Sequence, residues 1–171
     1  MVTTPSILEI KNLKKDRIAC HESPGIGMMV ELPSILEVID DLAQQVDFFS
    51  VGTNDFIQYM LAVDRTNEKV ADLYLPHHPA ILRAIKKVVS TALDFNRDVS
   101  ICGDMAHDEK YIAYLLGIGI RRFSVDVHHI PKVQRLIAAT DMRLAKKNVE
   151  RLLTKPKIKE IADIVGPRDQ R

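Results

Sequence analysis

The sequence has few cysteines, no excess charge of either sign and no long hydrophobic run. Its two cysteines, Cys20 and Cys102, lie 82 positions apart, which excludes a disulfide framework and a cysteine metal motif. We therefore expect a reducing, cytoplasmic setting. Lys and Arg number 24 against 23 acidic residues, a balance that gives no support for a nucleic-acid or membrane-surface partner. No run reaches the 18 or so apolar residues of a membrane span, and the N-terminal residues lack the pattern of a signal peptide.

Most of the chain alternates between strand-like and helix-like segments. Strands are predicted at 26–32, 47–52, 98–103 and 121–127, where apolar residues are nearly continuous. Helices are predicted after each of them, at 34–46, 54–64, 79–95, 108–119 and 130–139. Such alternation is typical of an α/β protein with a parallel sheet and crossover helices. Four units make either half of an eightfold barrel or a small open sheet.

The two ends of the chain differ from this regular middle. Residues 1–25 allow a short helical turn but have no clear period, so we expect a lead-in segment of uncertain order. Residues 26–140 contain the strand-helix units. Residues 141–171 form a tail with two amphipathic helices, predicted at 142–153 and 158–165.

Two carboxylates follow the first two strands. Glu31 closes the first strand and Asp55 follows the second, so parallel pairing would place both at one rim of the sheet. A hard cation such as Mg²⁺ takes oxygen ligands of this kind. The alternatives are a helix-start acid for Glu31 and helix capping, together with Asn54, for Asp55.

Three further sets of residues can carry chemistry. Cys102 ends the third strand and is either a small buried hydrophobe or a thiol that exchanges a proton with a substrate carbon. Arg65 is either a solvated charge, one partner of an ion pair with Asp64, or a clamp for phosphate or carboxylate. Five histidines, His77, His78, His107, His128 and His129, share no metal-ligand spacing, and we interpret them as loop residues.

Four blocks together resemble a known family: GMMVELPS, VDFFSVGTNDFIQYMLAVDRTNEKVADLYLPHHPAIL, SICGDMAHD and RRFSVDVHHIPKVQRLI. They are similar to the C-terminal, phosphoenolpyruvate-binding barrel of Enzyme I of the bacterial sugar phosphotransferase system and of its nitrogen-related paralogue. The resemblance extends from about Ile26 to the end of the chain. It implies the C-terminal half of a (β/α)8 barrel, followed by extra helices.

The resemblance also implies roles for the residues at the strand ends. Glu31 and Asp55 would bind Mg²⁺, and Asn54 would contact the phosphate of phosphoenolpyruvate. Arg65 would grip the anionic end of the substrate, and Cys102 would protonate the methylene carbon of the enolate to give pyruvate. The small residues Gly52 and Thr53 would let the backbone approach the metal-bound phosphate. A thiol suits the proton transfer because its pKa of about 8.5 can be tuned toward neutrality.

The chain also departs from the family. The family has Glu where Asp104 stands and Gly where His107 stands, and leucine and threonine where Phe56 and Ile57 occur. The resemblance does not extend to the N-terminal domain that carries the phosphorylated histidine and docks a small phosphocarrier protein. We therefore expect no phosphotransfer by this chain alone. Two alternatives remain: a dimerisation or regulatory module, because two half-barrels could complete each other in a homodimer, and part of a pyruvate phosphate dikinase or phosphoenolpyruvate synthase relative.

Overall fold

A four-stranded parallel sheet organises the computed structural model, which describes residues 4–21 and 23–165. Its strands are β1 (Gly27–Val30), β2 (Phe48–Gly52), β3 (Asp98–Cys102) and β4 (Arg122–Phe123), and they lie side by side in chain order. Met29 is in register with Ser50, and Ser50 with Ser100. The predicted α/β fold with a parallel sheet is confirmed, and this strand order is the one that half of a (β/α)8 barrel would have.

One helix precedes the first strand, helices connect the strands, and three helices follow the last strand. They are α1 (Thr4–Lys15), α2 (Ile35–Ala43), α3 (Thr53–Leu61), α4 (Pro79–Asp94), α5 (Glu109–Ile118), α6 (Ile130–Ala139), α7 (Met142–Thr154) and α8 (Ile158–Val165). Short 3₁₀ helices lie at η1 (Ala71–Leu73), η2 (Asp104–Ala106) and η3 (Val127–His129). In the described part of the chain, every helix is too short or too polar to cross a lipid bilayer.

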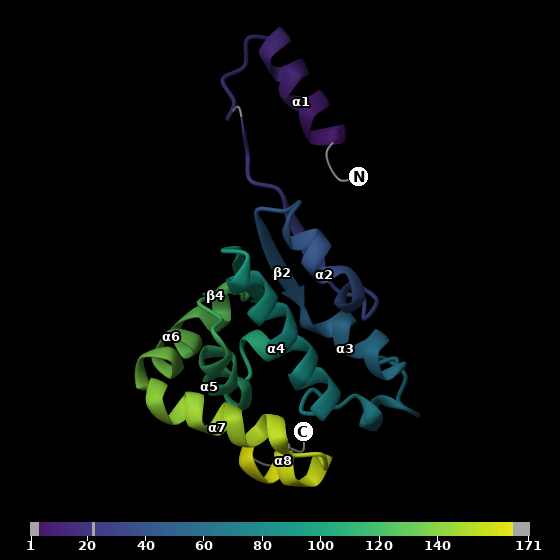
Figure 1. Ribbon diagram of the computed structural model, residues 1–171, viewed down its shortest axis with the longest axis vertical. Coiled ribbons are helices and arrows are strands. Elements are labelled where there is room, and N and C mark those ends of the chain that lie inside the picture. Colours follow the sequence, from purple (N-terminus) through teal and green to yellow (C-terminus); the bar gives the residue numbers. More distant parts are fainter. Residues whose placement is uncertain (1–3, 22, 166–171) are drawn as a thin grey trace.

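The N-terminal segment is more regular than its sequence predicted. Residues 4–15 form α1 rather than a single turn. Figure 1 shows this helix apart from the sheet and the other helices, joined to them by an extended connecting segment. The helix ends where Arg17 adopts a positive φ of 59°. Its neighbour Ile18 donates from the backbone to the carbonyl of Leu13, 2.9 Å away. A left-handed residue with such a hydrogen bond is a common way to close a helix.

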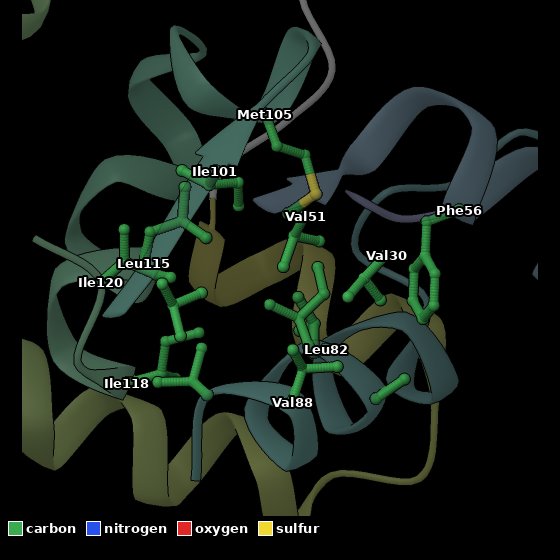
Figure 2. Packing of buried hydrophobic residues seen from close by; sticks show 14 of the residues in the cluster. Val30, Val51, Phe56, Leu82, Val88, Ile101, Met105, Leu115, Ile118 and Ile120 are labelled. Carbon is green, nitrogen blue, oxygen red and sulfur yellow. The ribbon is translucent and has the colours of Figure 1, made fainter. Parts of the chain in front are cut away.

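The core lies between one face of the sheet and the helices. Phe49, Val51 and Ile101 are fully buried on this face. Figure 2 shows Val30, Val51 and Ile101 directed toward Leu82 and Val88 of α4 and Leu115 of α5. The helices therefore cover this face of β1, β2 and β3.

The other face of the sheet is open within the described residues. The alternate side chains Met29 and Phe48 are 47% and 38% exposed, and Ser50, Ser100 and Cys102 are half-buried. The apolar runs in the sequence predicted a parallel sheet with crossover helices and did not indicate which face the helices cover. In the structure, helices cover only one side of this half of a barrel, so side chains alternate between the core and solvent.

The fourth strand is shorter than predicted. Only Arg122 and Phe123 pair with β3, and Ser124 adds one backbone hydrogen bond to the carbonyl of Ile101. Asp126 then caps η3, because its carboxylate accepts from the backbone N–H of His128 at 3.0 Å. A side chain that captures a nearby N–H favours a turn over a strand. The pairing therefore ends well before residue 127.

The tail helices pack against the barrel helices. Helix α7 lies along α5 and also contacts α4, as Figure 1 shows for α5 and α7. The guanidinium of Arg83 on α4 donates to the carbonyls of Leu153 and Lys155, at 3.1 and 3.0 Å. These bonds satisfy carbonyls at the C-terminal end of α7, where the helix offers them no partner of its own.

Candidate active site

The predicted site residues lie at the carboxyl ends of the strands. Gly52 pairs in register with Cys102, so α3, which begins at Thr53, and η2, which begins at Asp104, start from the same rim. The hydroxyl of Thr53 joins them by donating to the carbonyl of Cys102 at 2.8 Å. In parallel α/β folds this rim is where functional side chains gather.

Gly52 makes room for Glu31. A Cβ at position 52 would lie 2.9 Å from both Cγ and Oε1 of Glu31, closer than real atoms approach. The side chain of Glu31 therefore lies directly over the end of β2. The small residue at this turn gives space to a neighbouring carboxylate, which the sequence did not predict.

The Cys102 thiol is influenced by the charges of both predicted metal ligands. Burial raises the pKa of Cys102, and the negative charges of Glu31 and Asp55 raise it further, while a hydrogen bond from Ser50 lowers it. The Sγ atom lies 3.5 Å from the carbonyl oxygen of Val51. Without a metal ion, the pKa of the Cys102 thiol is therefore shifted upward, opposite to the direction that the resemblance implied.

The two structural alternatives for the predicted metal ligands, a helix-start acid for Glu31 and a helix cap for Asp55, are not what the structure shows. The N-cap of α3 is Gly52, with no capping bond from a side chain, so Asp55 does not cap that helix. Helix α2 begins at Ile35, and its first-turn acid is Glu37 rather than Glu31. In the described part of the chain, Glu31 and Asp55 form no ion pair. Within the described residues, these two carboxylates therefore lie at one rim without a cationic side chain as partner, and Asp55 also lies in the first turn of α3.

This pair of carboxylates suits one class of metal. Across residues 4–21 and 23–165, no three His, Cys, Asp or Glu side chains gather closely enough to hold an ion by themselves. Mg²⁺ does not require such a cage, because it keeps several waters and binds through one or two carboxylates and substrate oxygens. Glu31 and Asp55 fit this chemistry, whereas a site for zinc would need more protein ligands.

Arg65 and Asn54 meet at Asp104. Arg65 Nη1 donates to Asp104 Oδ2 at 3.1 Å, and the backbone N–H of Asp104 donates to Asn54 Oδ1 at 2.8 Å. Asn54 Nδ2 completes the contact by donating to Asp104 Oδ1 at 3.4 Å. The alternative pairing of Arg65 with Asp64 is wrong. The Asp64 carboxylate instead accepts from the backbone and hydroxyl of Thr66, at 2.8 and 2.7 Å.

Gly103 brings the two loops together. Its φ of +87° favours glycine, and a Cβ there would lie 2.7 Å from Asn54 Oδ1 and overlap the hydroxyl of Thr53. The positive φ and the lack of space for a Cβ both come from the contact between the start of α3 and η2. A larger residue at position 103 would separate Asn54 from Asp104.

Sequence reasoning missed one residue at this site and the contacts of two others. Thr53, expected only as a small residue near the phosphate, is fully buried and bridges the loops. Asp104 appeared only as a departure from the family. Tyr74 donates from its hydroxyl to the carbonyl of Asn54 at 3.4 Å, and burial, with Asp104, raises its pKa to about 12. The position of Asp104 directly after a strand was a signal, but nothing marked Tyr74, which lies 20 positions after Asn54.

The prediction that the five histidines are loop residues holds for His77, His78 and His107, whereas His128 and His129 lie in η3. His78 caps α4 by accepting from the backbone of Ala80 at 3.1 Å, and His77 lies 3.4 Å from the hydroxyl of Tyr111. The rings of His107 and His129 are stacked, with centroids 4.0 Å apart.

Comparisons with known proteins agree with this geometry. The profile of one family, described as "PEP-utilising enzyme, PEP-binding domain", matches residues 4–142. The chain is 40% identical over 157 residues to the phosphoenolpyruvate-protein phosphotransferases of Staphylococcus carnosus and Bacillus subtilis, which covers 92% of this chain and 27% and 28% of those proteins. It is 38% identical over 153 residues to the phosphotransferase of Buchnera aphidicola, covering 90% of this chain and 27% of that protein. The chain thus spans little more than a quarter of the length of these relatives. It belongs to the PEP-utilising enzymes, and residues 4–142 correspond to their PEP-binding domain.

Proposed function

We propose that this chain is the substrate-binding part of a phosphoenolpyruvate-protein phosphotransferase. The complete enzyme would bind Mg²⁺ and phosphoenolpyruvate, transfer the phosphoryl group to a histidine of a protein, and release pyruvate. The observation that carries the proposal is that Glu31, Asp55 and Cys102 lie at or just after the carboxyl ends of three neighbouring parallel strands, at one rim of the sheet. Family membership and the phosphotransferase relatives support the same reaction.

Binding of the substrate rests on complementary charge. Glu31 and Asp55 would hold Mg²⁺, which offsets the negative charge of phosphoryl and carboxylate oxygens when it is bound. Arg65 would contact the anionic end of the substrate, and Asn54 the phosphate. A guanidinium can grip such groups through parallel hydrogen bonds. The side chain of Arg65 uses one nitrogen on Asp104, which leaves its other donors for the substrate.

Cys102 would complete the reaction as a proton donor. Loss of the phosphoryl group leaves the enolate of pyruvate. The S–H bond of Cys102 breaks as a C–H bond forms at the methylene carbon, and the thiolate then regains a proton from water. A donor must hold its proton until that moment, and burial, the main cause of the raised pKa of the Cys102 thiol, supports this role even where Mg²⁺ offsets the charges of Glu31 and Asp55. Protonation of the carbon makes the phosphoryl transfer effectively one-way.

The remaining assignments concern the complete enzyme. We propose that residues 26–140 form the phosphoenolpyruvate-binding half-barrel and that the tail, predicted as 141–171, covers its outer side with residues 141–165, since 166–171 lie outside the described residues. The acceptor histidine and the docking site for a small phosphocarrier protein would lie in parts of the enzyme that this chain does not contain, and the enzyme would act in the cytoplasm. Incubation with labelled phosphoenolpyruvate is expected to leave this chain unlabelled, and stoichiometric labelling would contradict the assignment.

A homodimer is proposed from the open face of the sheet. Met29 and Phe48 are 47% and 38% exposed there, and apolar side chains on an uncovered face favour association. A second copy of the chain, packed with its own open face against this one, would bury both side chains. Sedimentation at micromolar concentration is expected to show a dimer that Phe48→Asp converts to a monomer. A wild-type chain that remains strictly monomeric would contradict the dimer but not the substrate site.

The substrate site can be tested by calorimetric titration with oxalate, a planar mimic of enolpyruvate. Wild-type chain is expected to bind oxalate only with Mg²⁺, and Asp55→Asn to lose this binding because one of two metal ligands is removed. Asp94→Asn is the matched control, since Asp94 is exposed at the far end of α4. Binding that needs no Mg²⁺, or that persists in Asp55→Asn, would contradict the site. No binding by wild-type would mean that residues outside this chain are required.

A further inference from the structure

We propose that Asp104 is a positioning residue that aligns Asn54 and Arg65 at the rim of the sheet. The proposal rests on the function proposed above, in which those two side chains contact the substrate. Asp104 is the point where they meet: its carboxylate accepts from both, and its backbone N–H donates to Asn54. The three residues come from α3, the loop after it, and η2.

The backbone bond determines which end of the Asn54 amide faces Asp104. Asn54 Oδ1 accepts from the Asp104 N–H at 2.8 Å, so this atom must be oxygen and the other end must be the NH₂ group. One hydrogen of that group points to the Asp104 carboxylate, at 3.4 Å between heavy atoms. The second hydrogen stays available to a phosphate oxygen. The backbone of residue 104 thereby makes Asn54 a donor toward the substrate, and the Asp104 carboxylate holds one of the two NH₂ hydrogens in place.

The ion pair with Asp104 orients Arg65 and occupies only one nitrogen of its guanidinium group. Only Nη1 contacts the carboxylate of Asp104, at 3.1 Å. The arginine and aspartate side chains are 37% and 60% exposed, so the pair itself adds little to folding stability. Its effect is to reduce the number of rotamers that Arg65 samples before substrate arrives. Ordering such a side chain in advance lowers the entropy cost of binding.

Asp104 also brings a negative charge near an anionic substrate, which opposes binding. Alignment and repulsion therefore predict opposite results when the charge is removed. If alignment dominates, Asp104→Asn should weaken oxalate binding about 3- to 10-fold, which is the range expected for losing the pre-ordering of one or two side chains. If repulsion dominates, the same variant should bind more tightly.

A nuclear magnetic resonance experiment tests the alignment directly, with no ligand present. The side-chain NH₂ signals of Asn54 and the Nε–H signal of Arg65 are assigned by their loss in Asn54→Ala and Arg65→Lys. Asp104→Asn is expected to move both sets of signals toward the values of free side chains. Asp104→Glu, which keeps the carboxylate on a longer and exposed side chain, is expected to retain shifts distinct from those values. Oxalate titrations with Mg²⁺ on the same variants then give the fold-change in affinity.

Glu109→Gln provides the matched control. Glu109 makes a similar exposed ion pair, with Lys132 at 3.4 Å, and lines the same pocket as Asp104. It contacts neither Asn54 nor Arg65 in any hydrogen bond of the described residues. This variant removes the same charge from the same region, so it should leave the assigned signals and the affinity unchanged.

The outcomes separate this proposal from the proposed function. Unchanged Asn54 and Arg65 signals in Asp104→Asn would overturn the positioning role, and so would tighter oxalate binding by that variant. Signals that respond to Asp104→Asn but not to Glu109→Gln support the role, even if the wild-type chain binds no oxalate. In that last case the alignment stands, and it is the binding function of the isolated chain that fails.

Discussion

The two faces of the sheet differ sharply in what their side chains do. On the helix side, Phe49, Val51 and Ile101 are fully buried in a continuous core. On the opposite side, Phe48 is 38% exposed, and Cys102 is half-buried near two carboxylates. One strand thus contributes alternate residues to stability and to the site. The folded structure depends on the first face, whereas the second face carries the candidate chemistry.

The largest expected effect comes from removing neighbouring aromatic rings on opposite faces. Phe49→Ala deletes a fully buried ring and should lower the free energy of unfolding by about 3–5 kcal/mol. Phe48→Ala should cost under about 1 kcal/mol, because that ring is already partly in water. Urea denaturation of both variants at low protein concentration measures the difference. Equal losses would mean that the open face is covered in solution, as the proposed homodimer requires.

A second prediction concerns the junction between the faces, at Gly103. Gly103→Ala forces a side chain into a left-handed position already occupied by Thr53 and Asn54. We expect a loss of about 1–3 kcal/mol in the free energy of unfolding, together with weaker oxalate binding. Gly25→Ala is the control, because a Cβ there would make only ordinary contacts, the nearest at 3.7 Å. Urea midpoints that match between the two variants would contradict the strained junction.

The sequence predicted the features that depend on residues close along the chain, and it did not predict the contacts between residues far apart in it. The helix from Pro79 and the strands at 48–52 and 98–102 were predicted to within about two residues, because their patterns are local. The common rim of Glu31, Asp55 and Cys102 followed from parallel topology. The pairing of Arg65 with Asp104 could not be predicted, since it joins loops 39 residues apart. The rise in the pKa of Cys102 depends on burial, which the sequence alone does not give.

The chemistry of the open face can be probed through the Cys102 thiol. In a Cys20→Ser background without metal, the rate of alkylation by iodoacetamide should rise with pH only above the range of a small free thiol. The reason is that burial, Glu31 and Asp55 all raise the pKa of Cys102. Glu31→Gln removes one negative charge and should move the inflection toward lower pH. An inflection at or below that of a free thiol would contradict the proton-donor role.

The smallest expected effect is a pH dependence from the stacked histidines. Burial and the neighbouring His129 lower the pKa of His107, partly opposed by Asp104 and Asp108, while Lys132 lowers it further. Its contribution to stability is therefore present above the unfolded pKa of about 6.5 and is lost as pH falls through the folded value. Between about pH 7.5 and about pH 5, wild-type should lose more stability than His107→Gln. Parallel urea midpoints across this range would contradict the pKa shift.

The unequal edges of the sheet have a consequence for handling the protein. At one edge, β4 pairs through only two residues before Asp126 turns the chain away. At the other, β1 runs for four residues, and its outer backbone groups have no neighbouring strand within the described sheet. An unpaired edge is a template for another strand. Edge-to-edge aggregation should therefore begin at β1. Met29→Lys places a charge on this edge strand at an exposed position and should improve solubility.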